Sequence, residues 1–272
     1  MANQCLNQEL FTVSKSQEAI FQGLKLELGH GAIEDLRAMR RYCKRRYCDL
    51  EEERDHGAWP ASEKDARNEE LKIVLIMELL ANEIIAMQNV PKASEHEDVF
   101  IWRGLARILY DYDLVVRVGE LGSSATREDR AAMEQEFGGT DSNVRSKKID
   151  LMHQLCLQGV GKPIELIAWE VKSSSVSPDI LQIQLRKNIR TNASIMNNIS
   201  QYMERTFPRP SPIILDIVGS KALAYTVRKF EPGAFGAGAV GDTMIQIPRH
   251  ADEIPEFLDG GGLSALLRIG VS

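Results

Sequence analysis

The pattern of hydrophobic and polar positions divides the chain into a helical first part and a mixed second part. In the first part, apolar residues recur at helical spacing over residues 16–28, 32–54 and 69–88. Beyond these segments, helical and strand patterns alternate. We therefore predict an N-terminal helical region, residues 1–92, that packs on an α/β domain, residues 93–272.

The second part is predicted to begin with a helix, followed by strands on both sides of a long helix. Ser94 and Glu97 have the spacing of a capping box and start the first helix. The long helix covers residues 178–204. The predicted strands cover residues 114–118, 147–157, 163–172, 212–218, 223–230 and 244–247. This order predicts an α/β fold with a mixed central sheet flanked by helices.

Other segments of the second part carry weaker patterns. Residues 119–142 are polar and end in a turn or mobile loop, and residues 233–241 are glycine-rich and read as a flexible hairpin loop. Short helices over residues 252–258 and 263–267 are expected to close the chain.

Charge and cysteine content narrow the classes of protein. The net charge is −6, so any basic surface for nucleic acid has to be local. The four cysteines lack zinc-ligand spacing and are expected to be reduced thiols. Neither a signal peptide nor a long apolar run is visible, so we expect an intracellular protein of the cytoplasm or nucleus, with no membrane partner.

Three polar residues at the ends of two predicted strands carry the candidate chemistry. Asp150 lies on one strand, and Glu170 and Lys172 point to the same face at the end of the next. Side by side, the two carboxylates would repel each other unless a cation lay between them, and such oxygen ligands suit Mg²⁺ or Mn²⁺. Lys172 would then position a water and stabilise charge on a phosphate.

This arrangement resembles the PD-(D/E)XK nuclease superfamily, whose motif is an Asp on one strand and Asp/Glu-x-Lys on the next. The order of elements over residues 94–218 also resembles the family core, although Ile149 stands where the motif has proline. The chain further resembles uncharacterised fungal proteins of this type. That likeness lies in Glu170-Val171-Lys172, Gln184-Leu185-Arg186-Lys187-Asn188, residues 219–225 and Ile245-Gln246-Ile247-Pro248.

The resemblance implies a restriction-endonuclease-like core and a metal-dependent endonuclease, a phosphodiesterase that hydrolyses DNA or RNA. Asp150 and Glu170 would bind Mg²⁺ or Mn²⁺, and Lys172 would complete the catalytic set. The helix before the first strand often contributes another glutamate in this family. Glu97 is the first candidate for this metal ligand, and Glu120 is the second.

The long helix carries candidate nucleic-acid contacts. Arg186 and Arg190 share one face, and with Lys187 they could hold phosphates near the metal. Gln184 is a candidate because several nuclease branches use a glutamine there. The alternatives are a solvated helix face and, for Gln184, a cap or a surface polar group.

Two other functions remain open. The chain could be a catalytically inactive nuclease-fold module for binding or interaction, or a helical scaffold or regulator in which the motif is accidental. The accidental motif predicts that Asp150 and Glu170 lie far apart. The basic run over residues 37–46 precedes three glutamates, which favours a charge-balanced helix with ion pairs over a nucleic-acid face. The N-terminal helices are a candidate surface for a protein partner.

Overall fold

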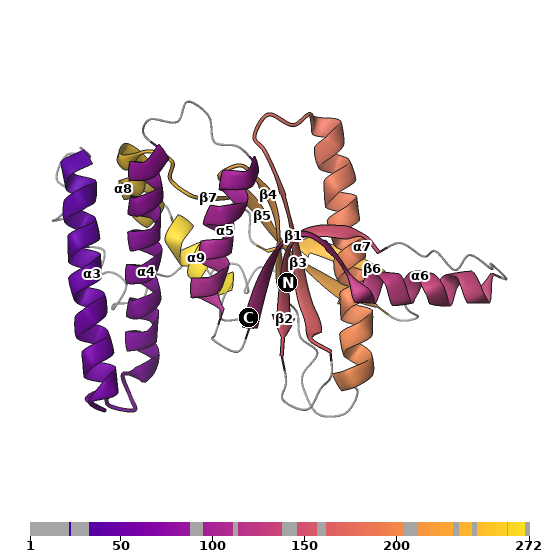
Figure 1. Cartoon of the computed structure of the whole chain (residues 1–272), viewed down its shortest axis with the longest axis horizontal. Helices are drawn as coiled ribbons and strands as arrows, with labels where there is room; N and C mark the ends of the chain where they lie inside the picture. The colour runs from indigo at the N-terminus through magenta and orange to yellow at the C-terminus, as the bar shows by residue number, and fades with distance from the viewer. Residues whose placement is uncertain are drawn as a thin grey trace, which may run out of the picture. The chain divides into compact units, whose positions relative to one another are not determined.

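The chain forms an α/β structure whose described residues fall into two compact units (Figure 1). The first unit takes the described residues within 1–93, 104–110 and 245–271, and the second takes those within 94–103 and 111–244. The C-terminal segment thus groups with the N-terminal helices. The computed structural model describes residues 22, 33–87, 95–110, 114–137, 146–156, 162–203, 212–230, 234–240, 244–259 and 261–269.

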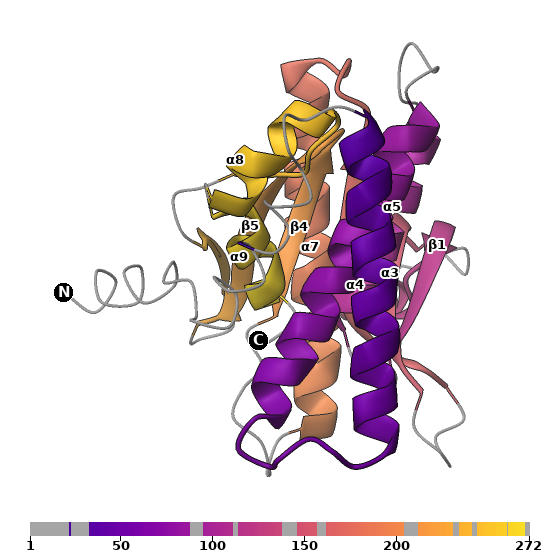
Figure 2. The same ribbon diagram turned by 90° about the vertical axis from the view of Figure 1, so that its left-hand side faces the viewer.

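Two long helices dominate the first unit. Helices α3 (Ile33–Asp55) and α4 (Lys64–Met87) run side by side in opposite directions (Figures 1 and 2). Arg46 of α3 pairs with Glu70 of α4 at 2.6 Å and with Glu53 at 3.8 Å. At Arg46, the last residue of the basic run, the ion pairs expected of a charge-balanced helix are therefore present.

Short elements complete the first unit. The second half of α5 (Glu95–Leu109) lies close to α4, since a Cβ on Gly104 would come within 2.7 Å of the Leu79 side chain. The C-terminal helix α9 contacts α4, α8 and β7. The C-terminal elements are β7 (Ile245–Gln246), η1 (Ala251–Glu253), α8 (Ile254–Asp259) and α9 (Gly262–Ile269).

The second unit is built on a mixed sheet, as the sequence predicts. Its strands follow the order β1-β2-β3-β4-β5-β6. The β3–β4 pair is parallel and the other neighbouring pairs are antiparallel, because the long helix α7 (Pro178–Met203) links β3 to β4. The strands are β1 (Leu114–Gly122), β2 (Lys148–Leu155), β3 (Ile164–Lys172), β4 (Ile213–Val218), β5 (Lys221–Lys229) and β6 (Phe235–Ala239).

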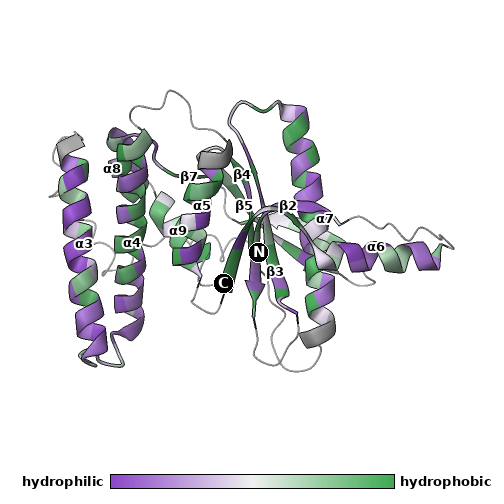
Figure 3. Cartoon of the chain, viewed as in Figure 1, coloured by the Kyte–Doolittle hydropathy of each residue, from purple (hydrophilic) through white to green (hydrophobic). Residues whose placement is uncertain are grey.

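Helix α7 packs on strands β3, β4 and β5. Figure 3 shows hydrophobic positions along the strands and a mixture of hydrophilic and hydrophobic positions along α7. The core beneath α7 is shared by α6, β2, β3 and α7. Its buried members are Ala125, Ile149, Met152, Ala168, Ile195 and Ile199.

The structure corrects the prediction for the polar segment after β1. Helix α6 (Ser124–Glu136) forms within this segment, for which the sequence predicted no helix. Its first turn is held by Glu165 of β3, a buried carboxylate that accepts hydrogen bonds from Ser123 Oγ at 2.7 Å, Ser124 N at 2.7 Å and Ala125 N at 3.3 Å. This cap comes from a residue 40 positions away from Ala125, so the local pattern did not reveal it.

The structure also corrects the prediction of a glycine-rich loop. Strand β6 forms there and pairs with β5. Gly236 is needed for close packing, because a Cβ there would come within 2.7 Å of the Phe230 ring.

Some predicted features lie outside the described residues. They include nearly all of the helix at residues 16–28, the Ser94 cap and the connection at residues 157–161. No helix in the described ranges is long and apolar enough to cross a membrane.

Candidate active site

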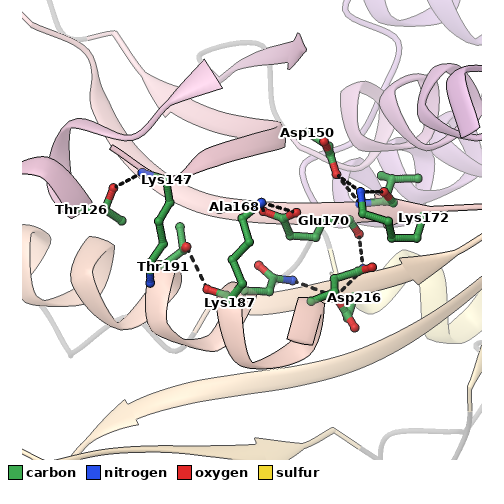
Figure 4. A network of polar contacts seen from close by, with 12 residues as sticks. Thr126, Lys147, Asp150, Ala168, Glu170, Lys172, Lys187, Thr191 and Asp216 are labelled. Carbon is green, nitrogen blue, oxygen red and sulfur yellow. Dashed lines mark hydrogen bonds and ion pairs between the residues drawn. The ribbon is translucent and has the colours of Figure 1, made fainter. Parts of the chain in front are cut away.

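Asp150 lies against the end of β3. Its Oδ2 atom accepts a hydrogen bond from Val171 N at 2.9 Å and lies 3.4 Å from Lys172 Nζ (Figure 4). Lys172 Nζ also donates to the carbonyl of Val171 at 2.8 Å. The Lys172 ammonium is therefore held by the Asp150 carboxylate and the Val171 carbonyl. Val171 is fully buried, as the strand alternation predicts.

Glu170 is almost completely buried, with 1% of its surface exposed. Lys187 Nζ donates to Glu170 Oε2 at 2.8 Å and lies 2.8 Å from Oε1 as an ion pair. Burial raises the pKa of Glu170 to about 7, against the hydrogen bond from Lys187 that lowers it, and the negative charge of Asp150 raises it further. The two carboxylates are therefore near enough to interact.

Asp216 of β4 is a site residue that the sequence analysis missed. It is paired in register with Glu170 on the neighbouring strand and is 7% exposed. Burial raises its pKa, while hydrogen bonds from Gln184 and Asn188 and the charge of Lys172 lower it. The signal was a single carboxylate inside the otherwise apolar segment Ile213–Val218.

Gln184 lies inside the protein. Its Nε2 donates to Asp216 Oδ1 at 2.8 Å, and it belongs to a buried row of amides on α7 with Asn188 and Asn192. Asn192 Oδ1 accepts from the Ala168 amide and its Nδ2 donates to the Ala168 carbonyl, each at 2.9 Å. These amides are four residues apart, so they share one helix face and fasten α7 to β3 and β4. The spacing was available in the sequence, but the alternatives considered for these polar residues were a nucleic-acid face, a solvated face and, for Gln184, a cap or a surface polar group.

The other predicted nucleic-acid residues of α7 have different surroundings. Arg186 and Arg190 are exposed, and Arg190 Nε donates to the Arg186 carbonyl at 3.1 Å. Lys187 turns from α7 to the Glu170 carboxylate (Figure 4). The sequence analysis did not select two further basic residues of this region, Arg130 and Lys147, whose charges interact.

The predicted metal shell is described only in part. The side chains of Glu97 and Glu120 lie outside the described residues. In the described part of the chain, no three His, Cys, Asp or Glu side chains form a metal-binding group. Asp150 Oδ2 and the Val171 carbonyl already hold a cationic group, the Lys172 ammonium. The charge of the Glu170 carboxylate interacts with that of Asp150, and oxygen donors of these kinds are the ones that Mg²⁺ and Mn²⁺ prefer.

His153 lies outside this chemistry. It is fully buried on β2, and its ring packs edge-on against Trp169 with 4.5 Å between ring centroids. Burial lowers its pKa to about 4, so the ring is neutral at pH 7.

Comparison of the chain with protein-family models, curated proteins and solved structures finds no match. Only the geometry of the site therefore points to a function. Four features define that geometry: Asp150 against the end of β3, buried Glu170, and Lys172 and Lys187 as their two lysine partners.

Proposed function

We propose that the chain is a metal-dependent phosphodiesterase of nuclease type, with a restriction-endonuclease-like core, that hydrolyses nucleic acid. The observation that supports this most is the meeting of Asp150, Glu170 and Lys172 where β2 begins and β3 ends. Two interacting carboxylates and a lysine at one point are the groups that metal-assisted phosphodiester hydrolysis requires.

In this proposal each residue has a separate role. Asp150, Glu170 and the Val171 carbonyl would hold Mg²⁺ or Mn²⁺, and Glu97 would complete the ligand set. The ion would supply Lewis-acid stabilisation of the charge on the phosphate. Lys172 would leave its contact with Asp150 to orient the attacking water and stabilise the developing negative charge.

The electrostatics of Glu170 set the pH at which the site can bind a cation. Its pKa is raised to about 7, so much of the carboxyl is protonated below pH 7. A carboxylate must lose its proton to bind a metal, and metal binding is therefore expected to strengthen as the pH rises through 7.

One specific observation favours the second candidate, a catalytically inactive binding module. Lys172 pairs with Asp150 at 3.4 Å, and Lys187 pairs with Glu170 at 2.8 Å. Each carboxylate thus has a lysine that compensates its charge without a metal. The accidental-motif alternative receives no such support, because it expects Asp150 and Glu170 to lie far apart.

The test is cleavage of nucleic acid by the purified full chain. Supercoiled plasmid, single-stranded DNA and RNA are incubated with Mg²⁺ or Mn²⁺, and Lys172→Ala is compared with Lys162→Ala, an exposed lysine just before β3. We expect wild type and Lys162→Ala to cleave at equal rates, and we expect the cleavage rate of Lys172→Ala to be lower by about 100-fold or more. No cleavage of any substrate, or equal cleavage by all three proteins, would contradict the proposal.

A further inference from the structure

Four basic side chains lie near enough to one another for their charges to interact at Lys147. Lys187 and Arg190 come from α7, Arg130 from α6 and Lys147 from the residue before β2. The pKa of Lys147 is lowered to about 8. Burial is the largest cause, and the positive charges of Arg190, Arg130 and Lys187 lower the pKa further. Three segments that are distant in the sequence thus bring their cations together.

The backbone of Lys147 is fixed at the start of α6. Its amide donates to Thr126 Oγ1 at 3.2 Å, and its carbonyl accepts from the Ser123 amide at 3.2 Å. Thr126 and Ser123 are both buried. From this point the Lys147 side chain extends in the direction of α7 (Figure 4).

Helix α6, which carries Arg130, is fixed at two places. Glu165 caps its first turn, and amides of α7 hold the next turns. Asn197 Nδ2 donates to Asp129 at 3.3 Å, and Asn198 Nδ2 donates to Glu128 at 2.8 Å. These two hydrogen bonds join α6 to α7 next to Arg130, so the backbone that carries Arg130 is held in place.

Among the charges that act on the Lys147 ammonium, those of the three neighbouring cations oppose it and that of Glu170 favours it. Glu170 is the carboxylate whose charge favours the Lys147 ammonium, and Glu170 is already paired with Lys187. Within the described residues, Lys147 Nζ and the Arg190 guanidinium form no ion pair. Like charges that lie close together repel one another. The free-energy cost of this repulsion falls when an anion binds between them.

We propose that Arg130, Lys147 and Arg190 form a phosphate subsite for a nucleic-acid strand, beside the phosphate that the proposed metal site at Asp150 and Glu170 would bind. Two guanidinium groups and an ammonium suit the oxygens of a backbone phosphate. This inference rests on the proposed function, since it places the substrate strand along the α6–α7 side of Glu170.

Binding of a fluorescein-labelled single-stranded oligonucleotide to the full chain tests the subsite. It is measured in EDTA, over a series of KCl concentrations, for wild type, Lys147→Gln, Arg190→Gln and Lys148→Gln. Lys148 is the charge-matched control, because it is exposed and adjacent to Lys147. We expect Lys147→Gln and Arg190→Gln to weaken binding about tenfold each. The slope of log K against log salt should fall by about 0.7 per lost contact.

A second variant separates lost binding from lost folding. Lys147→Arg keeps the positive charge and is expected to restore most of the affinity that Lys147→Gln loses. Unchanged affinity and salt slope in Lys147→Gln would overturn the subsite. An equal loss in Lys148→Gln would overturn it too, because the effect would then be one of overall charge.

Competition by inorganic phosphate and by unlabelled oligonucleotide distinguishes the two sources of phosphate. If Lys147→Gln weakens binding of inorganic phosphate and leaves oligonucleotide binding unchanged, the assignment to a strand is wrong. Failure of the proposed function looks different. In that case the oligonucleotide would bind in EDTA and depend on Lys147, while wild type cleaved no substrate with Mg²⁺ or Mn²⁺.

Discussion

Replacing Glu170 by glutamine should stabilise the protein at alkaline pH. The folded-state pKa of Glu170 is about 7, against an ordinary value of 4.5, mainly because the side chain is buried. The folded chain therefore holds this proton more tightly than the unfolded chain, and stability falls as the pH rises from 4.5 through 7. Each pKa unit corresponds to about 1.4 kcal/mol, so the ionised carboxylate costs the fold about 3 kcal/mol at pH 8.

Urea unfolding at pH 5 and pH 8 measures this cost. Fluorescence of the buried Trp169 reports on the sheet around the site. We expect Glu170→Gln to exceed wild type by about 3 kcal/mol in free energy of unfolding at pH 8 and by less than about 1 kcal/mol at pH 5. Lys187 loses its partner in this variant but is 32% exposed, so water can solvate its ammonium.

Glu165 offers a matched control on the same strand. It is also buried, but its carboxylate accepts hydrogen bonds from the first turn of α6. Glu165→Gln should therefore lower the free energy of unfolding by about 2 kcal/mol or more at pH 8. This change is opposite in sign to the one expected for Glu170→Gln. The reasoning is refuted if both variants lose stability at pH 8, or if Glu170→Gln gains equally at both pH values.

Three further outcomes follow from the same contacts. The pKa of His153 is about 4 in the folded protein against 6.5 in the unfolded chain, so wild type should lose up to about 3 kcal/mol of its free energy of unfolding as the pH falls from 6.5 to 4. His153→Leu should therefore make unfolding less sensitive to acid. Asn192→Leu should cost about 2–4 kcal/mol in urea unfolding, since it leaves the Ala168 amide and carbonyl without their partner. Lys187→Met should raise the pKa of Glu170, because the lysine that favours the ionised carboxylate is removed. The pH at which Mn²⁺ affinity begins to fall on the acid side should then be higher, as measured by calorimetry from pH 6 to 9.

Each of these outcomes has a control in the chain. His250 is exposed, so His250→Leu should leave the pH dependence of unfolding unchanged, and an equal effect of both histidines would contradict the account. Ser194 donates to a backbone carbonyl on the exposed side of α7, so Ser194→Ala should cost far less than the change at Asn192. If Mn²⁺ affinity falls at the same pH in Lys187→Met as in wild type, Lys187 does not set the charge of Glu170.

The sequence was informative where a local pattern determines the structure. The apolar run of β3 and the two-residue alternation of Glu170 and Lys172 located that strand and its polar end. The approach of Asp150 followed from antiparallel pairing of β2 with β3, which the short predicted connection implied. These features depend on neighbours in the sequence, so one chain was enough to predict them.

The missed features depend on residues that are distant in the sequence. Helix α6 buries few apolar side chains and is capped by Glu165, so its own segment looked merely polar and no helix was predicted. The roles of Asp216 and of the amide row headed by Gln184 appear only when β4 lies beside β3 and under α7. Likewise, Lys147 and its basic neighbours come from three separate segments.

Calorimetric titration of Mn²⁺ into wild type and Glu170→Ala at pH 8 is the direct test of a metal centre at Asp150 and Glu170. At this pH the Glu170 carboxyl, with its pKa of about 7, is mostly ionised in the wild type. The account predicts a saturable Mn²⁺ site in wild type that Glu170→Ala loses. Equal, weak binding by both proteins would contradict the claim that Asp150 and Glu170 form a metal centre.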